Sequence, residues 1–317
     1  MHSGSPRSAA RSRSRWLQAA MALGLLALIG SLATPAGAIN CYTEKMRTEP
    51  HLLLGAQGPG ARSDQSSPPA GPPPNPGVGD TWNWYLWYFG GGPPHAEYKP
   101  CTVRGMGQNV YVIVNDADWN VWVHQADVDQ IVRNWDNSSY GNWPNEGIYQ
   151  LDTEHFGPAP DRLDHDPRIY VVLYDWDVTG ADGYFNSDDE DTTAVTSNRC
   201  ECVYVDASTS QPGGPSGAYL TAVMAHEFTH MIQWNADPFE AAWVDEGQAE
   251  LAMWFYGHPD PITGFPTNPD NNLTNFTGNF ADYIKGYLFS MYFWEHYGGT
   301  PSLLAWVANP QISLTGV

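Results

Sequence analysis

Hydrophobic and polar residues alternate with two different periods along this chain. Between residues 80 and 175, runs of β-branched and aromatic residues predict strands at 81–89, 109–115 and 168–174, and a helix at 128–135. Farther on, apolar residues recur at helical spacing and predict one helix at about 219–234 and a second helix that continues to about 255. This order of elements predicts an α+β fold, with a mixed sheet followed by a mostly helical C-terminal lobe.

The predicted strands are unusually aromatic. Trp82, Trp84 and Trp87 follow one another in the first of them. A platform of tryptophans can bind carbohydrate, but core and inter-strand packing is the commoner role of such residues, and it is the one we predict here.

The first 38 residues have the pattern of a secretory signal peptide. Four arginines precede an apolar run at 17–32, and Ala36-Gly37-Ala38 provides small residues for cleavage. The run has sixteen residues and is interrupted by Gly and Ser, which is short for a membrane span. We therefore expect cleavage after Ala38, secretion of the protein, and no membrane span in the mature chain.

Residues 55–79 are rich in Gly, Pro and Ser and contain almost no large apolar side chains. Such a composition predicts an extended linker, because it cannot bury enough surface to offset the entropy of ordering. The predicted organisation is a signal peptide at 1–38, a stub and linker at 39–79, and one domain at 80–317. The sequence leaves open whether 39–79 is a pro-segment and whether the C-terminus is complete.

The helix predicted at 219–234 carries the pattern His-Glu-x-x-His. His226 and His230 are four residues apart and lie on one helix face, where both imidazoles can bind one metal ion. Glu227 is placed to act as a base toward water without binding the ion itself. The pattern indicates a zinc-dependent hydrolase, although five residues can also match by chance on an ordinary amphipathic helix.

A catalytic zinc ion takes three protein ligands, and a following helix commonly supplies a carboxylate as the third. Glu246 and Glu250 are the candidates, one turn apart. We predict Glu246 as the ligand and Glu250 as a hydrogen-bonding partner of a histidine or a solvated side chain. Asp237 and Pro238 read as the start of this helix, which would place Glu246 two turns into it.

In combination these motifs resemble a known group, the glutamate-zincin peptidases. The resemblance rests on two stretches, His226-Glu227-Phe228-Thr229-His230 and Trp243-Val244-Asp245-Glu246-Gly247. Weaker matches at 183–186, 197–206 and 287–298 are similar to the secreted hyicolysin-type and immune-inhibitor-A-type bacterial metallopeptidases. The resemblance implies a zincin catalytic domain with zinc on His226, His230 and Glu246. It also implies an oxyanion-binding role for Tyr283, because Tyr283-Ile284-Lys285-Gly286 looks like a step in related aminopeptidases; packing is the alternative.

The chain is strongly acidic. Its formal charge is −21, and removal of the four signal-peptide arginines leaves ten basic against 35 acidic residues, a charge of −25. Such a surface disfavours nucleic acid and anionic membranes. A dense acidic stretch, Asp182, Asp188, Asp189, Glu190 and Asp191, predicts either a calcium site or a solvated acidic loop.

Four cysteines are present, at positions 41, 101, 200 and 202. In a secreted protein an even number predicts two disulfides, and every such pairing would cross-link Cys41. Direct bonding of Cys200 to Cys202 would need local distortion of a strand.

Three functions are consistent with these motifs. The leading hypothesis is a secreted zinc endopeptidase in which Glu227 is the general base and Tyr283 assists. A zinc exopeptidase and a non-catalytic surface or adhesion module that keeps the fold are the alternatives. Peptide or protein is the expected substrate, while substrate preference and oligomeric state are not determined by the sequence.

Overall fold

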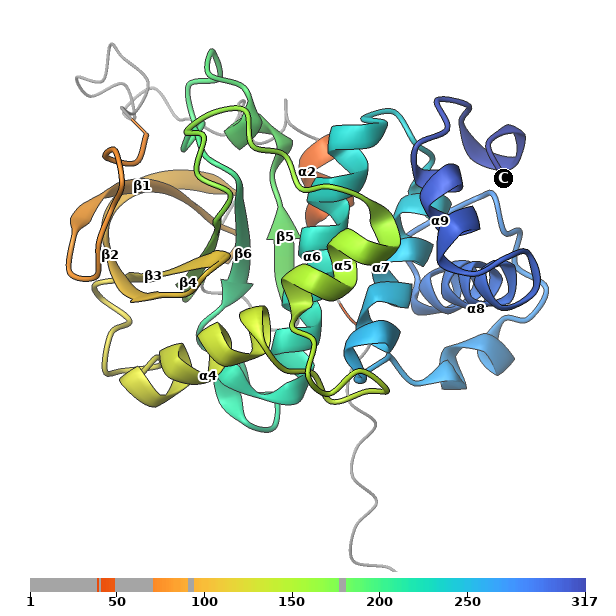
Figure 1. Cartoon of the computed structure of the whole chain (residues 1–317), viewed down its shortest axis with the longest axis horizontal. Coiled ribbons are helices and arrows are strands. Elements are labelled where there is room, and N and C mark those ends of the chain that lie inside the picture. The colour runs from red at the N-terminus through yellow and green to blue at the C-terminus, as the bar shows by residue number, and fades with distance from the viewer. Residues whose placement is uncertain (1–38, 40, 49–70, 91–93, 177–180) are drawn as a thin grey trace, which may run out of the picture. The chain divides into compact units, whose positions relative to one another are not determined.

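A computed structural model describes residues 39, 41–48, 71–90, 94–176 and 181–317 (Figure 1). The predicted signal peptide and most of the predicted linker lie outside these residues. The helices are α2 (Thr43–Thr48), α4 (Gln125–Asp136), α5 (Ile148–Phe156), α6 (Ala218–Ala236), α7 (Ala242–Tyr256), α8 (Phe280–His296) and α9 (Thr300–Val307). The strands are β1 (Thr81–Tyr88), β2 (His95–Met106), β3 (Val110–Asn115), β4 (Ile169–Tyr174), β5 (Gly183–Phe185) and β6 (Cys202–Asp206). The described residues also form short 3-10 helices, η1 (Ser187–Glu190), η2 (Gly214–Ser216), η3 (Ile262–Thr267) and η4 (Ser313–Thr315).

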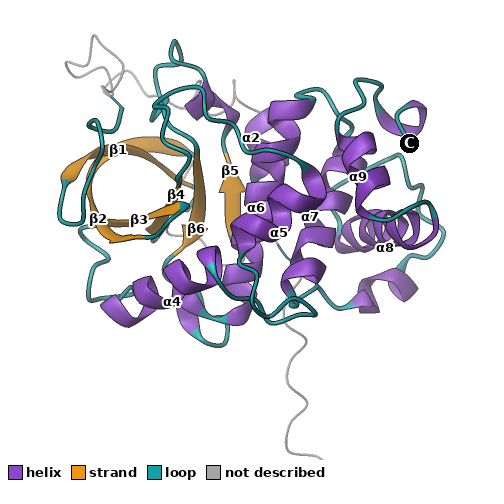
Figure 2. Cartoon of the chain, in the orientation of Figure 1, coloured by secondary structure: helices purple, strands orange, loops and turns teal. Residues whose placement is uncertain are grey.

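The strands form one mixed sheet in the order β1-β2-β3-β4-β6-β5. The central pairs β3–β4 and β4–β6 are parallel, whereas β1–β2, β2–β3 and β5–β6 are antiparallel. A bulge between Val103 and Gly105 bends β2, and β1 to β4 curl strongly (Figure 2). The short strand β5 is the last in the order and therefore forms an edge of the sheet.

Residues of the sheet divide between two hydrophobic clusters according to the two-residue period of a strand. In β3, Val110, Val112 and Val114 pack with the helices, whereas Tyr111 and Ile113 point to the other face. That second face holds Trp84 and Trp87, which are almost fully buried. The prediction that these two tryptophans pack in the core is confirmed.

Helix α6 lies between the sheet and the C-terminal helices α7 to α9, beside α5 and α7 (Figure 1). Every residue from Tyr219 to Gln233 is buried, so this part of α6 has no face open to solvent. The reason is that strands cover one side of α6 and helices cover the other. In the part of the chain that the structure describes, no helix is long and apolar enough to cross a membrane.

The α+β class is confirmed, with differences in detail. The sequence did not predict α2, β2 or α5. Asp237 does not begin α7; its N–H donates to the carbonyl of Gln233 and ends α6, while α7 begins at Ala242. Glu246 therefore lies one turn into α7 rather than two.

The N-terminal stub is not separate from the domain. Ile39 and Cys41 are buried in the cluster around α6, and Met46 is buried in the second cluster. Tyr42 donates its N–H to the carbonyl of Gly183 at 3.1 Å, which joins the stub to β5. We call Ile39 and residues 41–47 the N-terminal segment.

Candidate metal site

Four buried side chains from three segments of the chain come close together. His226 and His230 come from α6, Glu246 comes from α7, and Cys41 comes from the N-terminal segment. One ligand atom of each lies within 4.8 Å of all the others. This group of sulfur, nitrogen and oxygen donors could hold a metal ion.

The spacing of the donor atoms fits a tetrahedral ion. With bonds of about 2.0–2.3 Å, tetrahedral ligands lie roughly 3.3–3.6 Å apart. Nε2 of His226 and Nε2 of His230 are 3.1 Å apart, and Oε2 of Glu246 lies 3.2 and 3.4 Å from them. Sγ of Cys41 lies 3.5 Å from Nε2 of His230.

The hydrogen bond at the other ring nitrogen of His230 also fits a metal site. Nδ1 of His230 lies 2.9 Å from Oδ1 of Asp245, and a carboxylate can only accept there, so Nδ1 carries the hydrogen. In the neutral imidazole, Nε2 then presents a lone pair to the other ligands. A bound cation would satisfy donors that otherwise face one another, and a carboxylate behind a histidine is typical of zinc sites.

Glu250 lies behind the other histidine. Its Oε1 is 3.8 Å from Nδ1 of His226, on the ring edge opposite Nε2. Neither oxygen of Glu250 has a hydrogen-bond partner among the described residues. The geometry therefore groups Glu246 with the ligand atoms and leaves Glu250 outside the group.

Helices α7 and α8 approach each other closely beside Glu246. A Cβ atom at the next residue, Gly247, would lie 2.6 Å from the carbonyl carbon of Gly286 in α8. Only glycine fits there without moving α8. The Glu-Gly step thus places a potential ligand next to the contact between α7 and α8.

Glu227 lies beside the group, under the edge strand. A Cβ atom at Gly183 would lie 2.8 Å from Oε1 of Glu227, so β5 covers this carboxylate closely. Oε2 accepts a hydrogen bond from Oγ1 of Thr43 at 2.8 Å and lies 3.6 Å from Sγ of Cys41. Burial raises the pKa of Glu227, against the opposing effect of the two histidines and Thr43.

Tyr283 is buried on α8, with its ring 4.9 Å from that of Phe276. Burial first, and then the charges of Glu246 and Cys41, raise the pKa of its phenol. Its hydroxyl group therefore stays protonated at neutral pH.

Electrostatic interactions within this group shift the pKa values of its side chains. Burial acts to raise the pKa of Glu246, but the charge of His230 and hydrogen bonds with both histidines lower it to about 2. Burial acts to lower the pKa of His230, but Asp245 and Glu246 raise it well above its usual value. Burial and the charge of Glu227 raise the pKa of Cys41. Buried charges of this kind are stable only when they are paired or bind a cation.

Most of the acidic side chains at 182–191 form hydrogen bonds within the protein. Asp189 accepts from the Asn198 N–H and from the hydroxyl of Tyr204, at 2.5 and 2.8 Å. Asp191 accepts from Thr193 at 2.8 Å, and Tyr219 donates to Asp182 at 3.0 Å. Among the described residues, the Cys41 group alone brings three or more potential ligands together. No such group of ligands therefore supports the predicted calcium site.

The prediction of two disulfides is wrong for this structure, because all four cysteines are free and buried. Cys41 lies in the cluster on the α6 side of the sheet, whereas Cys101, Cys200 and Cys202 lie in the cluster on the other side. The sheet thus separates Cys41 from every partner that was considered for it.

Sequence reasoning placed His226, Glu227, His230 and Glu246 together, and missed three neighbours. The signal for Asp245 was its position next to a predicted ligand, where a carboxylate is a natural partner for a histidine. Cys41 and Thr43 carried no local signal, because their approach to α6 depends on how the N-terminal segment folds back.

Searches against protein-family models and against curated proteins found no match to this chain. The resemblance noted in the sequence therefore gains no support from them, and the site has to be interpreted from its own geometry.

Proposed function

We propose that this chain is a secreted zinc-dependent endopeptidase of the zincin type. The observation that carries the proposal is the convergence of one donor atom each from His226, His230 and Glu246, which lie 3.1 to 3.4 Å apart. Glu227 lies beside this group. Two nitrogen donors and one carboxylate are a ligand set that zinc takes in hydrolases. The proposal of secretion rests on the sequence of residues 1–38.

In this proposal His226, His230 and Glu246 would hold the ion, and Asp245 would orient His230 through its hydrogen bond. When bound, zinc supplies Lewis-acid chemistry, lowering the pKa of water and polarising the scissile carbonyl. The burial of all three ligands keeps bulk water away and strengthens every electrostatic interaction in the site.

Glu227 would act as the general base. It takes a proton from the attacking water and passes it to the nitrogen of the leaving amine. The raised pKa of its buried carboxyl brings Glu227 closer to neutral pH, where a base works most efficiently. Oε1 has no hydrogen-bond partner among the described residues and is free to take that proton.

Tyr283 would donate a hydrogen bond to the carbonyl oxygen as negative charge develops on it. Its protonated hydroxyl and its place on α8, which packs against α7, support this role. Tyr283 and Glu246 come from neighbouring helices, α8 and α7, whose contact is fixed by Gly247 and Gly286.

The edge strand β5 favours a polypeptide substrate. Edge strands present unpaired backbone groups, and an extended peptide can add to them as a further strand. Such binding uses backbone hydrogen bonds on both sides of the scissile bond and needs no chain terminus. It therefore favours an endopeptidase over an exopeptidase.

The decisive experiment combines metal analysis with cleavage assays. Because Cys41 lies against the site, the whole chain and its Cys41→Ala variant are both assayed on casein and on peptides with free or blocked termini. We expect about one zinc per chain, loss of cleavage with a chelator, and cleavage of blocked peptides.

A second variant, Glu227→Gln in the Cys41→Ala background, should retain zinc and lose cleavage by several orders of magnitude. His226→Ala is the matched control and should lose zinc as well. Loss of zinc from Glu227→Gln, or full activity in it, would contradict the assigned roles.

A further inference from the structure

We propose that Cys41 is a fourth metal ligand and that the N-terminal segment is a built-in inhibitor that keeps this site closed. The inference rests on the proposed function, because it concerns the regulation of the same site. It assigns a role to a segment that the sequence presented only as a stub before a linker.

The position of Cys41 is that of a ligand. In a tetrahedral zinc site, sulfur and nitrogen ligands at bonds of about 2.3 and 2.1 Å lie roughly 3.6 Å apart. Sγ of Cys41 lies 3.5 Å from Nε2 of His230, and it completes the group with His226 and Glu246. Thiolate sulfur is a preferred zinc donor, so this contact is chemically suitable as well as correctly spaced.

Four protein ligands close a zinc site, whereas hydrolysis needs one position for water. Three of the ligands here come from α6 and α7, which are parts of the packed core. The fourth comes from the N-terminal segment, 185 positions before His226 in the sequence. It is therefore the ligand that can leave without dismantling the site.

The same segment also engages the proposed base. Thr43 donates its hydroxyl hydrogen to Oε2 of Glu227 at 2.8 Å and accepts from the N–H of Phe185 at 2.8 Å. Thr43 is thus fixed between β5 and the carboxylate. While it is there, that oxygen of Glu227 is not free to contact water.

The backbone of the segment lies along the edge where a substrate would bind. Cys41 forms a bridge with Gly183 of β5 in the parallel sense, and Tyr42 donates to the carbonyl of Gly183. This is the mode in which extended peptides add to a sheet edge. The segment and an extended substrate would therefore compete for the same backbone groups.

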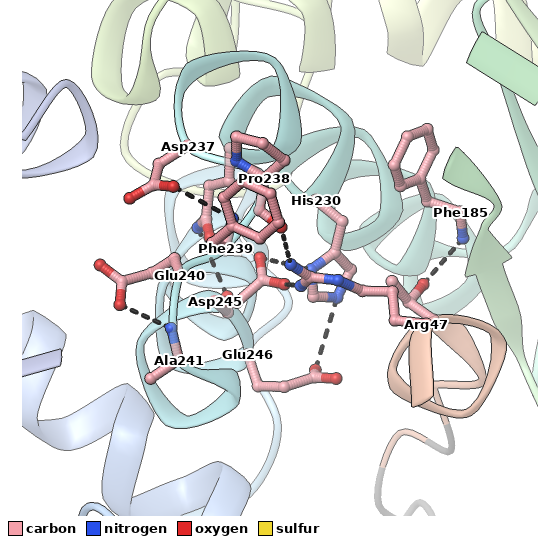
Figure 3. Close-up of polar contacts among 12 residues, drawn as sticks. Arg47, Phe185, His230, Asp237, Pro238, Phe239, Glu240, Ala241, Asp245 and Glu246 are labelled. Carbon is pink, nitrogen blue, oxygen red and sulfur yellow. Dashed lines mark hydrogen bonds and ion pairs between the residues drawn. The ribbon is translucent and has the colours of Figure 1, made fainter. Parts of the chain in front are cut away.

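Two anchors hold the segment on either side of Cys41. The N–H of Ile39 donates to Asp260 at 2.8 Å, and both groups are buried. Arg47 forms an ion pair with Asp245 and donates to the carbonyl of Pro238 at 2.9 Å (Figure 3). Since Asp245 also contacts His230, Arg47 connects the segment through Asp245 to this proposed ligand.

The test uses cobalt(II) in place of zinc in the whole chain, because a cobalt–thiolate bond gives a charge-transfer absorption that nitrogen and oxygen ligands do not give. The wild-type chain should show this band together with the visible bands of tetrahedral cobalt. Cys41→Ala should lose the charge-transfer band and keep the others. Cys101→Ala, which removes a buried thiol on the other side of the sheet, should change neither.

Cleavage of casein is then measured on the same variants, loaded with zinc in place of cobalt. Because activity scales with the fraction of molecules in the open state, we expect a rise of at least about tenfold in Cys41→Ala and none in Cys101→Ala. Cys41→Ser is the second variant, in case alanine leaves a cavity that impairs folding, and circular dichroism checks both.

The outcomes separate the two proposals. Tetrahedral cobalt bands without the charge-transfer band in the wild type would overturn the role of Cys41 and leave the proposed function intact. A charge-transfer band that disappears in Cys41→Ala with no gain in cleavage would make Cys41 a permanent structural ligand and overturn the inhibitory role. Absence of cobalt bands from every variant would contradict metal binding, and with it the proposed function.

Discussion

Nδ1 of His230 lies 2.9 Å from Oδ1 of Asp245, and the other oxygen of Asp245 pairs with Arg47 (Figure 3). One carboxylate thus contacts a histidine that we propose as a metal ligand and also holds the N-terminal segment. Because Asp245 directly precedes Glu246, the first turn of α7 supplies both a proposed ligand and the group that would orient another one.

Replacement of Asp245 should weaken metal binding without abolishing it. In Asp245→Asn the side chain keeps its size but loses its charge, so His230 is oriented less firmly and is a weaker donor. We expect zinc affinity to fall about 10- to 100-fold, as for other partners of metal-binding histidines. Competition titration with a chromophoric chelator measures this. Asp237→Asn, on the loop before α7, is the control and should leave the affinity unchanged.

The two glutamates of α7 should differ in their effect on zinc. Glu246→Ala removes an atom that lies 3.2 Å from Nε2 of His226, so the affinity should fall far more than 100-fold. Glu250→Ala removes a group near the opposite ring nitrogen and should cost at most roughly 10- to 100-fold. Isothermal titration of both variants decides the matter. The reverse ranking would make Glu250 the ligand.

Tyr283 should affect the rate of cleavage and leave zinc binding unchanged. In the Cys41→Ala background, Tyr283→Phe removes one hydrogen-bond donor to the developing oxyanion, and kcat should fall about 100- to 1,000-fold with little change in KM. Tyr287→Phe, one turn farther along α8, is the matched control. Equal, small effects of both substitutions would assign Tyr283 to packing.

The buried carboxyl of Glu190 should make the folded protein less stable as pH rises. Burial and the nearby charge of Glu201 raise the pKa of Glu190 from 4.5 to about 8, despite Arg162 at 3.5 Å. Between these two pH values the folded state holds a proton that the unfolded state has released. The contribution of Glu190 to the free energy of unfolding therefore falls as pH rises through this interval, and is constant above about pH 8.

Glu190→Gln removes this dependence because the amide does not ionise. Its free energy of unfolding, relative to the wild type, should increase from pH 5 to pH 8 and then level off. Urea unfolding at each pH measures the difference, so that effects common to both proteins cancel. Glu295→Gln, at an exposed position on α8, is the control. A difference that stayed flat with pH would show that Glu190 is not the group responsible.

Local patterns determined a large part of this structure. Alternation of apolar residues gave β1, β3 and β4 within a residue or two, and helical spacing gave α6, because side chains on these elements meet neighbours that recur at a fixed period. The same spacing put His226 and His230 on one face of one helix, so two of the proposed ligands followed from the sequence alone. Glu246 followed from its distance along the chain and from a resemblance.

Tertiary structure decided what no local pattern could encode. The start of α7 at Ala242, the choice between Glu246 and Glu250, and the meeting of Asp245 with His230 depend on the angle at which α7 crosses α6. The position of Cys41 depends on contacts between residues almost 190 apart, and the sheet that separates it from the other cysteines overrides the even cysteine count. Sequence spacing fixes neighbours within one element, whereas contacts between distant segments are chosen by packing of the whole core, which is why the proposed inhibitor was visible only in the folded chain.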